Sequence, residues 1–346
     1  MRRLLILLTF LFVLAVPANA MEFSAPEAPD SVQELLPAQQ ESFAGDLWKI
    51  VRSAVGRFQP KLVDACGVCL SLIAVVLLIS LLQQFSKGNS KLLQMLAALA
   101  IGSLLFQNAD QMIRTAADTV KQISEYEKLL LPVMTGAMAA QGGLTTSTAL
   151  YAGTAVLDAV LSAAIAGILV PMTYIFLLLA VGNSATGEDM LAKLRDFVKW
   201  LMSWILKIIL YIFTGYLGIT GVVSGTADAA ALKATKLTIS GMVPVVGSIL
   251  SDASEAVILG AGVMKSAVGV YGLLTIIAIW ITPFLQIGIQ YLILKATASI
   301  CAVFGVKNAS ALIRDFSAAM GLLLAMTGTV CLLMLISTVC YMKGIS

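Results

Sequence analysis

The chain has 346 residues, of which 59% are hydrophobic and only 12% are charged, with a mean hydropathy of +0.95. Globular domains are about half apolar and about a quarter charged, so this composition indicates a membrane protein. The net charge of +3 argues against nucleic-acid binding. Histidine is absent and the five cysteines are scattered, which removes the usual parts of metal sites and acid–base catalysis. We therefore expect no enzyme activity, no metal and no cofactor.

Residues 1–20 have the pattern of a secretory signal peptide. Two arginines precede the apolar stretch Leu4–Val16, and small residues at Ala18 and Ala20 mark a cleavage site. We expect a mature chain that starts at Met21. The alternative is an uncleaved first span, although this stretch is shorter than the roughly 20 residues that a hydrocarbon core needs.

Residues 21–61 form the longest polar segment, which a signal peptide would deliver to the extracytoplasmic side. Within it, Phe43–Phe58 spaces its apolar residues mostly at intervals of three and four, and this predicts an amphipathic helix. We favour a helix that lies on the membrane surface, and the alternative is a docking surface for another protein.

Residues 62–108 are predicted to form two transmembrane helices. The short loop between them carries Lys87 and Lys91, which favours the cytoplasmic side and agrees with an extracytoplasmic N-terminus. Cys66 and Cys69 have the spacing of a redox pair, but we favour the simpler interpretation that they are small apolar residues of a buried helix.

The rest of the chain is predicted to contain two copies of one membrane repeat, residues 109–221 and residues 222–346. Two pairs of prolines support this prediction, because both pairs have the same separation of 39 residues. These prolines are also the candidate helix breaks: Pro132 and Pro171 in the first copy, and Pro244 and Pro283 in the second. The polar stretch Ser224–Glu255, which surrounds Pro244, marks the second copy most clearly.

Both copies follow the same order, which ends in an Arg-Asp-Phe tripeptide at 195–197 and at 314–316 and then a span. The alternative to a duplication is coincidence between apolar helices of similar composition. Duplicated halves with interrupted helices are typical of transport folds, in which a pathway crosses near the bilayer midplane. The number of spans per copy decides whether the copies are parallel or inverted. We predict an all-α, polytopic membrane helix bundle of about six to eight spans, with an internal duplication and Pro-broken helices.

Two ionisable residues fall in corresponding long spans of the two copies. Asp158 belongs to the first copy and Lys265 to the second. A charge at membrane depth costs roughly 2.5 to 3.5 kcal/mol, so such residues face a bundle interior or water. Two interpretations stay open: the pair lines a polar pathway, or it forms an interhelical ion pair that fixes helix packing.

Small residues are dense on some helix faces, as at Gly215, Gly218, Gly221 and Gly225. Such faces suit internal packing or a homo-oligomer. A glycine-rich phosphate loop that ends in Gly-Lys-Ser/Thr is absent from the sequence, which favours another subunit or an ion gradient as the energy source.

Three stretches resemble the stage III sporulation protein AE family of endospore-forming bacteria. They are SGTADAAALKATKLTISGMVPVVGSILSDASEAV from Ser224, GVMKSAVGVYGLL from Gly262, and LIRDFSAAMGLLLAMTGTVCLLMLIS from Leu312. The resemblance implies a multi-pass protein of the mother-cell membrane that surrounds the engulfed forespore. It also implies a secretion-like channel, built with other membrane proteins of the same sporulation operon, an ATPase subunit and a forespore membrane partner. That channel would sustain forespore development and late forespore gene expression.

We therefore expect a membrane component of this channel, with the duplicated unit as its pore or export-gate region. The alternatives are a stand-alone secondary transporter for a small solute and a non-conducting membrane scaffold. A transporter should move solute alone in liposomes, whereas a gate should need the complex. A scaffold should tolerate neutralisation of Asp158 and Lys265.

Overall fold

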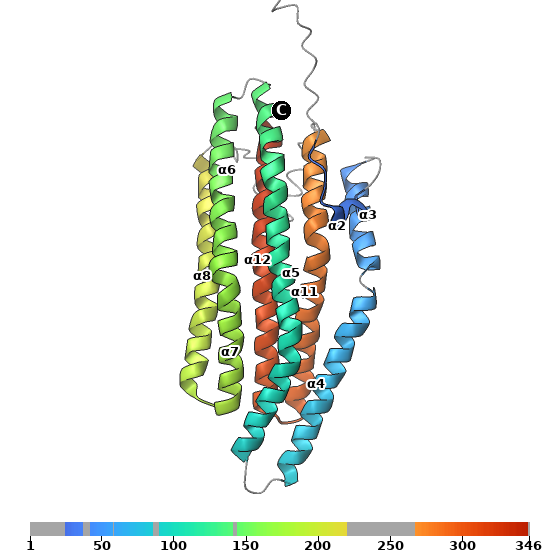
Figure 1. Cartoon of the computed structure of the whole chain (residues 1–346), viewed down its shortest axis with the longest axis vertical. Coiled ribbons are helices and arrows are strands. Elements are labelled where there is room, and N and C mark those ends of the chain that lie inside the picture. The colour runs from blue at the N-terminus through green and yellow to red at the C-terminus, as the bar shows by residue number, and fades with distance from the viewer. Residues whose placement is uncertain are drawn as a thin grey trace, which may run out of the picture.

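The computed structural model describes residues 25–36, 42–57, 59–85, 90–140, 144–219 and 267–344. The predicted signal peptide, the stretch Ser224–Glu255 with Pro244, and Lys265 lie outside these ranges. Within them the chain is helical and contains no strand (Figure 1). The all-α part of the predicted fold class is therefore confirmed for the described residues.

The helices follow one another with short connections. In chain order they are α2 (Asp30–Gln33), α3 (Phe43–Gly56), α4 (Gln59–Phe85), α5 (Ser90–Ala140), α6 (Leu144–Ala164), the π-helical turn η1 (Ile165–Leu169), α7 (Val170–Thr186), α8 (Asp189–Ile219), α11 (Ala267–Val303) and α12 (Lys307–Gly344).

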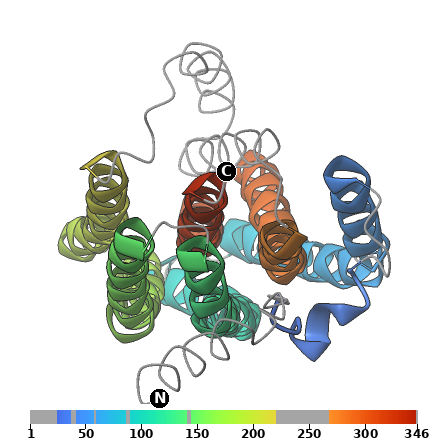
Figure 2. The same ribbon diagram turned by 90° about the horizontal axis from the view of Figure 1, so that it is seen from above.

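The long helices form an antiparallel bundle around α12. Helix α12 contacts α11, α5, α7, α8 and α6, and most of its described side chains are buried. Figure 2 shows α12 in the middle, with α11 on one side and α6 and α8 on the other. A helix that is apolar all round is stable only when it is enclosed, which explains why α12 takes the central position.

The ends of the bundle differ. The end of α4, the start of α5 and the α7–α8 and α11–α12 turns gather at one end, which we call the turn end (bottom in Figure 1). The C-terminal ends of α5 and α12 lie at the other end. Helices α6, α7 and α11 therefore run toward the turn end, whereas α5, α8 and α12 run away from it.

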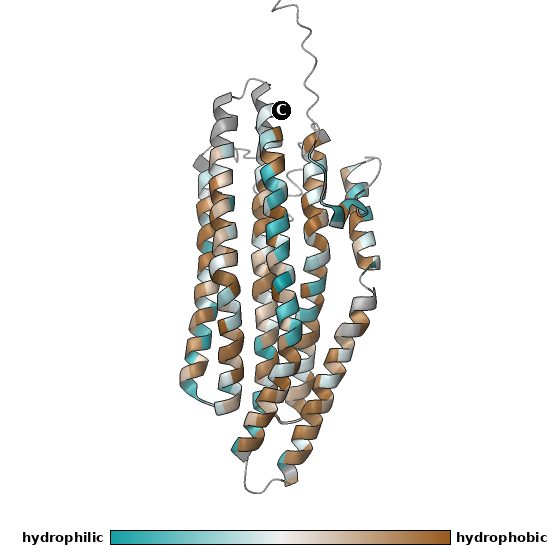
Figure 3. Ribbon diagram, viewed as in Figure 1, coloured by the Kyte–Doolittle hydropathy of each residue, from teal (hydrophilic) through white to brown (hydrophobic). Residues whose placement is uncertain are grey.

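Five described helical segments are long and apolar enough to cross a membrane: Ala65–Gln83, Lys91–Ala137, Tyr151–Thr186, Val268–Val303 and Lys307–Val339. Large apolar side chains of α4 and α5 are more than half exposed, as a lipid-facing surface requires: Leu70, Leu78, Leu81, Leu96 and Leu99. The parts of α4 and α5 near the turn end are predominantly hydrophobic (Figure 3). These features make the chain a multi-pass membrane protein.

Helix α8 is not among these five segments, although the sequence predicts a span from Phe197 to Gly221. The helix itself forms, from Asp189 to Ile219. Its apolar run contains Lys199 and Lys207 and follows the charged residues Arg195 and Asp196 directly. The described residues thus contain fewer candidate spans than the six to eight predicted.

Two of the predicted helix breaks are absent from the structure. Helix α5 continues through Pro132 as one helix of 51 residues, and α11 continues through Pro283. The segments that we expected to be separate on either side of each proline therefore belong to one continuous helix. A proline inside a helix removes one hydrogen bond, and packing against neighbouring helices offsets that loss. Both helices contact α12 and each other.

An interruption does occur close to Pro171. The π-helical turn Ile165–Leu169 lies between α6 and α7, and Pro171 is in the first turn of α7. Proline has no N–H, and its ring clashes with the carbonyl four residues earlier, at Gly167, in a regular helix. The wider π turn accommodates this misfit without ending the span. The predicted break near Pro171 thus takes the form of a local π turn.

Helix α3 confirms the predicted amphipathic helix, and the structure shows what its apolar face contacts. Phe43, Ile50 and Ala54 are buried, and α3 contacts α11. Trp48, on the outer face, is 67% exposed. The apolar face of α3 therefore covers α11 of the same chain, and not the membrane surface as we favoured from the sequence.

Candidate functional site

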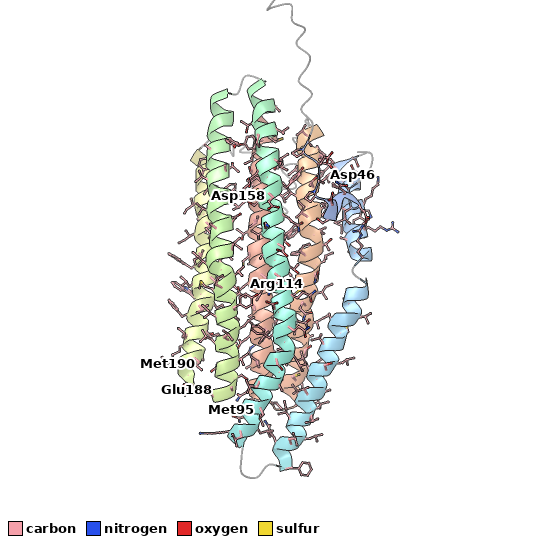
Figure 4. All side chains as sticks on the ribbon, in the orientation of Figure 1. Asp46, Met95, Arg114, Asp158, Glu188 and Met190 are labelled. Carbon is pink, nitrogen blue, oxygen red and sulfur yellow. The ribbon has the colours of Figure 1, made fainter. Side chains whose placement is uncertain are left out.

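Asp158 is buried in the interior of the bundle, on the face of α6 that contacts α5. Its carboxylate Oδ2 accepts a 2.7 Å hydrogen bond from Ser124 Oγ of α5. Ser162, one turn further along α6, has its Oγ 3.5 Å from Asp158 Oδ1. Figure 4 shows Asp158 in the half of the bundle away from the turn end. The prediction that this residue faces a bundle interior is therefore confirmed by its 4% exposure.

A second acid, Glu127 of α5, lies beside Asp158. Glu127 is 3% exposed, and neither of its carboxylate oxygens has a hydrogen-bond partner. It follows Ser124 by three residues, so the two side chains share one helix face. The carboxyl groups of Glu127 and Asp158 are close enough to interact electrostatically. Two acids from different helices thus meet inside the protein.

Sequence reasoning missed Glu127, although a signal was present. The amphipathic pattern of Asp110–Lys128 places Asp118, Lys121, Glu125 and Lys128 on the polar face of this helix. Glu127 instead follows Val120 by seven residues and Ile123 by four, which is the spacing of the apolar face. Glu127 can therefore be identified from the sequence as an acid on the apolar face of an amphipathic helix.

Hydroxyl groups from two helices surround this acidic pair. Tyr341 of α12 is fully buried, and Glu127, Thr135 and Thr154 lie within interaction range of it. Neither the Tyr341 hydroxyl nor the Thr154 hydroxyl makes a hydrogen bond that meets the usual geometric limits. Buried polar groups normally have partners, so unpartnered groups at one place mark a feature that needs an explanation.

Lys265, the predicted partner of Asp158, lies outside the described residues, so the pairing of the two stays a prediction. Cys66 and Cys69 are free thiols in α4. Cys69 Sγ accepts a 2.8 Å hydrogen bond from Thr297 Oγ1 of α11, which places it in a helix contact. Gly215 is exposed, and within the described part of the chain no atom lies within 4 Å of a methyl group added there.

A second polar group joins α5 to α7. Tyr174 Oη donates a 2.6 Å hydrogen bond to Asp110 Oδ1, and Arg114 Nε lies 2.8 Å from Asp110 Oδ2. The Asp110 carboxylate thus accepts hydrogen bonds from both a phenol and a guanidinium. It connects α5 and α7 at the depth of a predicted span.

Helix α5 also carries a charged stripe on its outer surface. The stripe consists of six side chains at helical spacing: Asp110, Arg114, Asp118, Lys121, Glu125 and Lys128. The Arg114 and Lys121 side chains are 74% and 73% exposed. Figure 3 shows this hydrophilic stripe along α5, and Figure 4 shows Arg114 in the middle of the molecule. With three acids and three bases the stripe has no net charge.

At the turn end a cavity of about 260 Å³ is lined by polar side chains of four segments, among them Gln83, Gln94, Ser184 and Lys307. Between this cavity and the acidic pair, the faces of α12 are packed with buried leucine and methionine side chains. The cavity and the acidic pair are therefore separated by apolar packing. The described residues contain no group of three or more histidine, cysteine or acidic side chains that is able to hold a metal ion.

These features define a polytopic α-helical membrane protein with a buried acidic pair and an exposed charged stripe. The chain belongs to the stage III sporulation protein AE family, whose family model matches residues 31–344. This confirms the resemblance seen in the sequence and makes the chain a membrane protein of stage III sporulation.

One relative is stage III sporulation protein AE of Bacillus subtilis (strain 168), which is 22% identical over 193 residues. The aligned region covers 56% of this chain and 48% of the relative, so it spans about half the length of that protein. No solved structure matches the chain.

Proposed function

We propose that this protein is an integral membrane component of a sporulation-specific, secretion-like channel that links mother cell and forespore. It lies in the mother-cell membrane around the forespore and works with membrane proteins of the same operon, an ATPase subunit and a forespore membrane partner. Its contribution is required for forespore development and late forespore gene expression. The membership of the family supports the cellular process, and one feature of the surface supports an assembly.

That feature is the charged stripe of α5. Exposed side chains such as Arg114 and Lys121 would face lipid if the bundle worked alone at this depth, and each charge at membrane depth costs roughly 2.5 to 3.5 kcal/mol. The internal pairs Asp110–Arg114 and Lys121–Glu125 reduce this cost without removing it. The stripe is therefore suited to face other subunits or a water-filled passage between them.

The packed interior favours the same arrangement. Apolar packing around α12 separates the cavity at the turn end from the acidic pair. A passage through one bundle would need these side chains to separate, whereas a passage between subunits leaves them in place. We infer that the charged stripe lines or borders such a passage. Lys87 and Lys91, which the sequence places between α4 and α5 and at the start of α5, favour a cytoplasmic position for the turn end.

Purification from sporulating cells tests the proposal. A tagged wild-type protein should bring down other products of the operon. The charge-reversed variant with Arg114→Glu and Lys121→Glu should reach the membrane but lose these partners and block forespore gene expression. Lys193→Glu, which reverses an exposed charge on α8, is the matched control and should behave as wild type. Recovery of wild-type protein alone, without operon products, would count against an assembly.

The Asp158–Lys265 pair belongs to the same proposal as a predicted element of the pathway or of helix packing. Neutral replacements, Asp158→Asn and Lys265→Gln, should each reduce forespore gene expression if the pair acts in the pathway. Full activity of both single variants would remove its functional role.

A stand-alone secondary transporter is the second candidate, because the buried acidic pair is a feature that ion-coupled transport uses. The purified protein in liposomes separates the two candidates. Solute uptake by this chain alone favours the transporter, and uptake that requires the other operon products favours the channel.

A further inference from the structure

We propose that Glu127 and Asp158 together bind a single monovalent cation, H⁺ or Na⁺, between α5 and α6. The site is independent of the proposed channel function, since it concerns what the purified chain binds and not what it assembles with. It is composed of oxygen atoms only: the two carboxylates and the neighbouring hydroxyl groups.

The geometry comes from three helices. Helices α5 and α6 contact each other and bring the acids together, and α12 closes the site from a third side. Asp158 is oriented by the 2.7 Å hydrogen bond from Ser124. Glu127, one helical turn from Ser124, has two unpartnered carboxylate oxygens that remain free to bind a cation.

The hydroxyls of Tyr341 and Thr154 are independent evidence for a ligand. Tyr341 is fully buried and Thr154 is 3% exposed, yet both oxygens lack a hydrogen-bond partner. Glu127 and Thr154 lie within interaction range of Tyr341, so its hydroxyl borders the site. A buried hydroxyl without a partner loses free energy, and a bound cation or its water would restore the missing interaction.

Among the described residues, the charge balance also favours a bound cation. The groups that face the acids are the Tyr341 phenol of α12, with the Tyr216 phenol of α8 beside it, and the acids themselves from α5 and α6. Lys128 is next to Glu127 in the chain and attracts its carboxylate, but Lys128 is exposed and lies on the charged stripe of α5. None of the fully buried side chains in the described ranges is lysine or arginine. Two adjacent carboxylates in a low-dielectric interior repel each other, and one bound cation removes most of this repulsion.

The ligand set favours a monovalent cation. Carboxylate and hydroxyl oxygens suit hard cations, but Ca²⁺ needs six to eight oxygen ligands and Mg²⁺ a near-ideal octahedron. Two acids and their hydroxyls supply too few charged ligands for these ions. The two carboxylates suit a single positive charge, either a proton shared between the acids or Na⁺ bound by the same oxygens.

Infrared spectroscopy of the purified full-length protein tests the H⁺ form, with choline as the only other cation. As the pH is lowered, wild type should show the C=O stretching band of a protonated carboxyl group. The band should appear at a pH at which exposed acids are still ionised. Glu127→Gln and Asp158→Asn should each remove this band. Glu125→Gln is the matched control, because it makes the same change at an exposed position of α5, and it should retain the band.

Titration with NaCl at fixed pH tests the Na⁺ form, with KCl as the ionic-strength control. The midpoint temperature of unfolding of wild type should rise with each tenfold increase in Na⁺ concentration above the dissociation constant. In Asp158→Asn the midpoint should not depend on Na⁺. Wild type that shows neither the band nor Na⁺ dependence would overturn the proposal. Cation dependence that appears only in the Lys265→Gln variant would also overturn it, because Lys265 would then balance the charge of the acids in wild type.

Discussion

Arg195 of α8 and Asp315 of α12 form an ion pair, with 2.6 Å between Arg195 Nη1 and Asp315 Oδ2. Both side chains are largely buried, at 15% and 14% exposure, and Arg195 also binds the neighbouring Asp196 at 2.9 Å. The two partners belong to the two Arg-Asp-Phe tripeptides. Corresponding tripeptides of the two predicted repeat copies are thus in direct contact.

Breaking this pair should destabilise the bundle, because Arg195 stays largely buried and keeps only its contact with the more exposed Asp196. We expect Asp315→Asn to lower the free energy of unfolding in detergent by about 1–3 kcal/mol, from the loss of a hydrogen bond to a charged group. Chemical denaturation measures this. Arg314→Gln neutralises the exposed neighbour in the same tripeptide and should change stability by less than about 0.5 kcal/mol. Equal effects of the two variants would contradict a special role for the Arg195–Asp315 pair.

The two glycines that join the helices before these tripeptides should behave alike. Gly187 has φ 74° between α7 and α8, and Gly305 has φ 79° between α11 and α12. An added methyl group would meet nothing within 4 Å at either position, so the cost of alanine comes only from the backbone. We expect Gly187→Ala and Gly305→Ala each to cost about 1–2 kcal/mol in unfolding experiments.

Gly56→Ala is the control for this pair, since that glycine ends α3 without a positive φ and also has open space around it. It should be neutral or slightly stabilising. Similar costs at Gly187 and Gly305 would agree with the proposed duplication. In that case the copies are parallel, because α7 and α11 both run toward the turn end (Figure 1).

Much of the fold was predictable because its signals are local. Long apolar runs predicted the spans, and the spacing of apolar residues in residues 43–58 predicted α3. The helix breaks were harder to predict, because the effect of a proline depends on its neighbours. Pro132 and Pro283 lie within continuous helices that pack on α12, whereas a π turn lies just before Pro171. The sequence alone does not contain this tertiary context.

The candidate site was half predictable for a similar reason. Asp158 stands out as a lone acid in an apolar run, so its position alone indicates a buried role. Glu127 is hidden among the many charges of α5, and only its helical phase distinguishes it from Glu125. That the two acids meet depends on the packing of α5 against α6, which no local pattern contains.

Gly153 of α6 should be intolerant of any side chain. A methyl group added there would collide with the ring of Tyr216 of α8. We expect Gly153→Ala to force these two helices apart and to cost about 1–3 kcal/mol of unfolding free energy, as overpacked sites do. Gly215→Ala is the control, because a methyl group added at Gly215 meets nothing within 4 Å. This variant should not destabilise α8. A neutral Gly153→Ala variant would show that Tyr216 moves aside without cost.

The hydrogen bond between Tyr174 and Asp110 should stabilise the contact between α5 and α7. Tyr174→Phe removes the phenol that donates to Asp110 Oδ1 at 2.6 Å and leaves the ring, which lies 6.2 Å from that of Phe106, in place. Because Asp110 keeps its ion pair with Arg114, we expect a moderate loss of about 1–2 kcal/mol in the free energy of unfolding. Tyr211→Phe, at a 69% exposed position of α8, is the matched control and should have no measurable effect. If the two tyrosine variants unfold at the same denaturant concentration, the Tyr174–Asp110 bond contributes nothing to the helix contact.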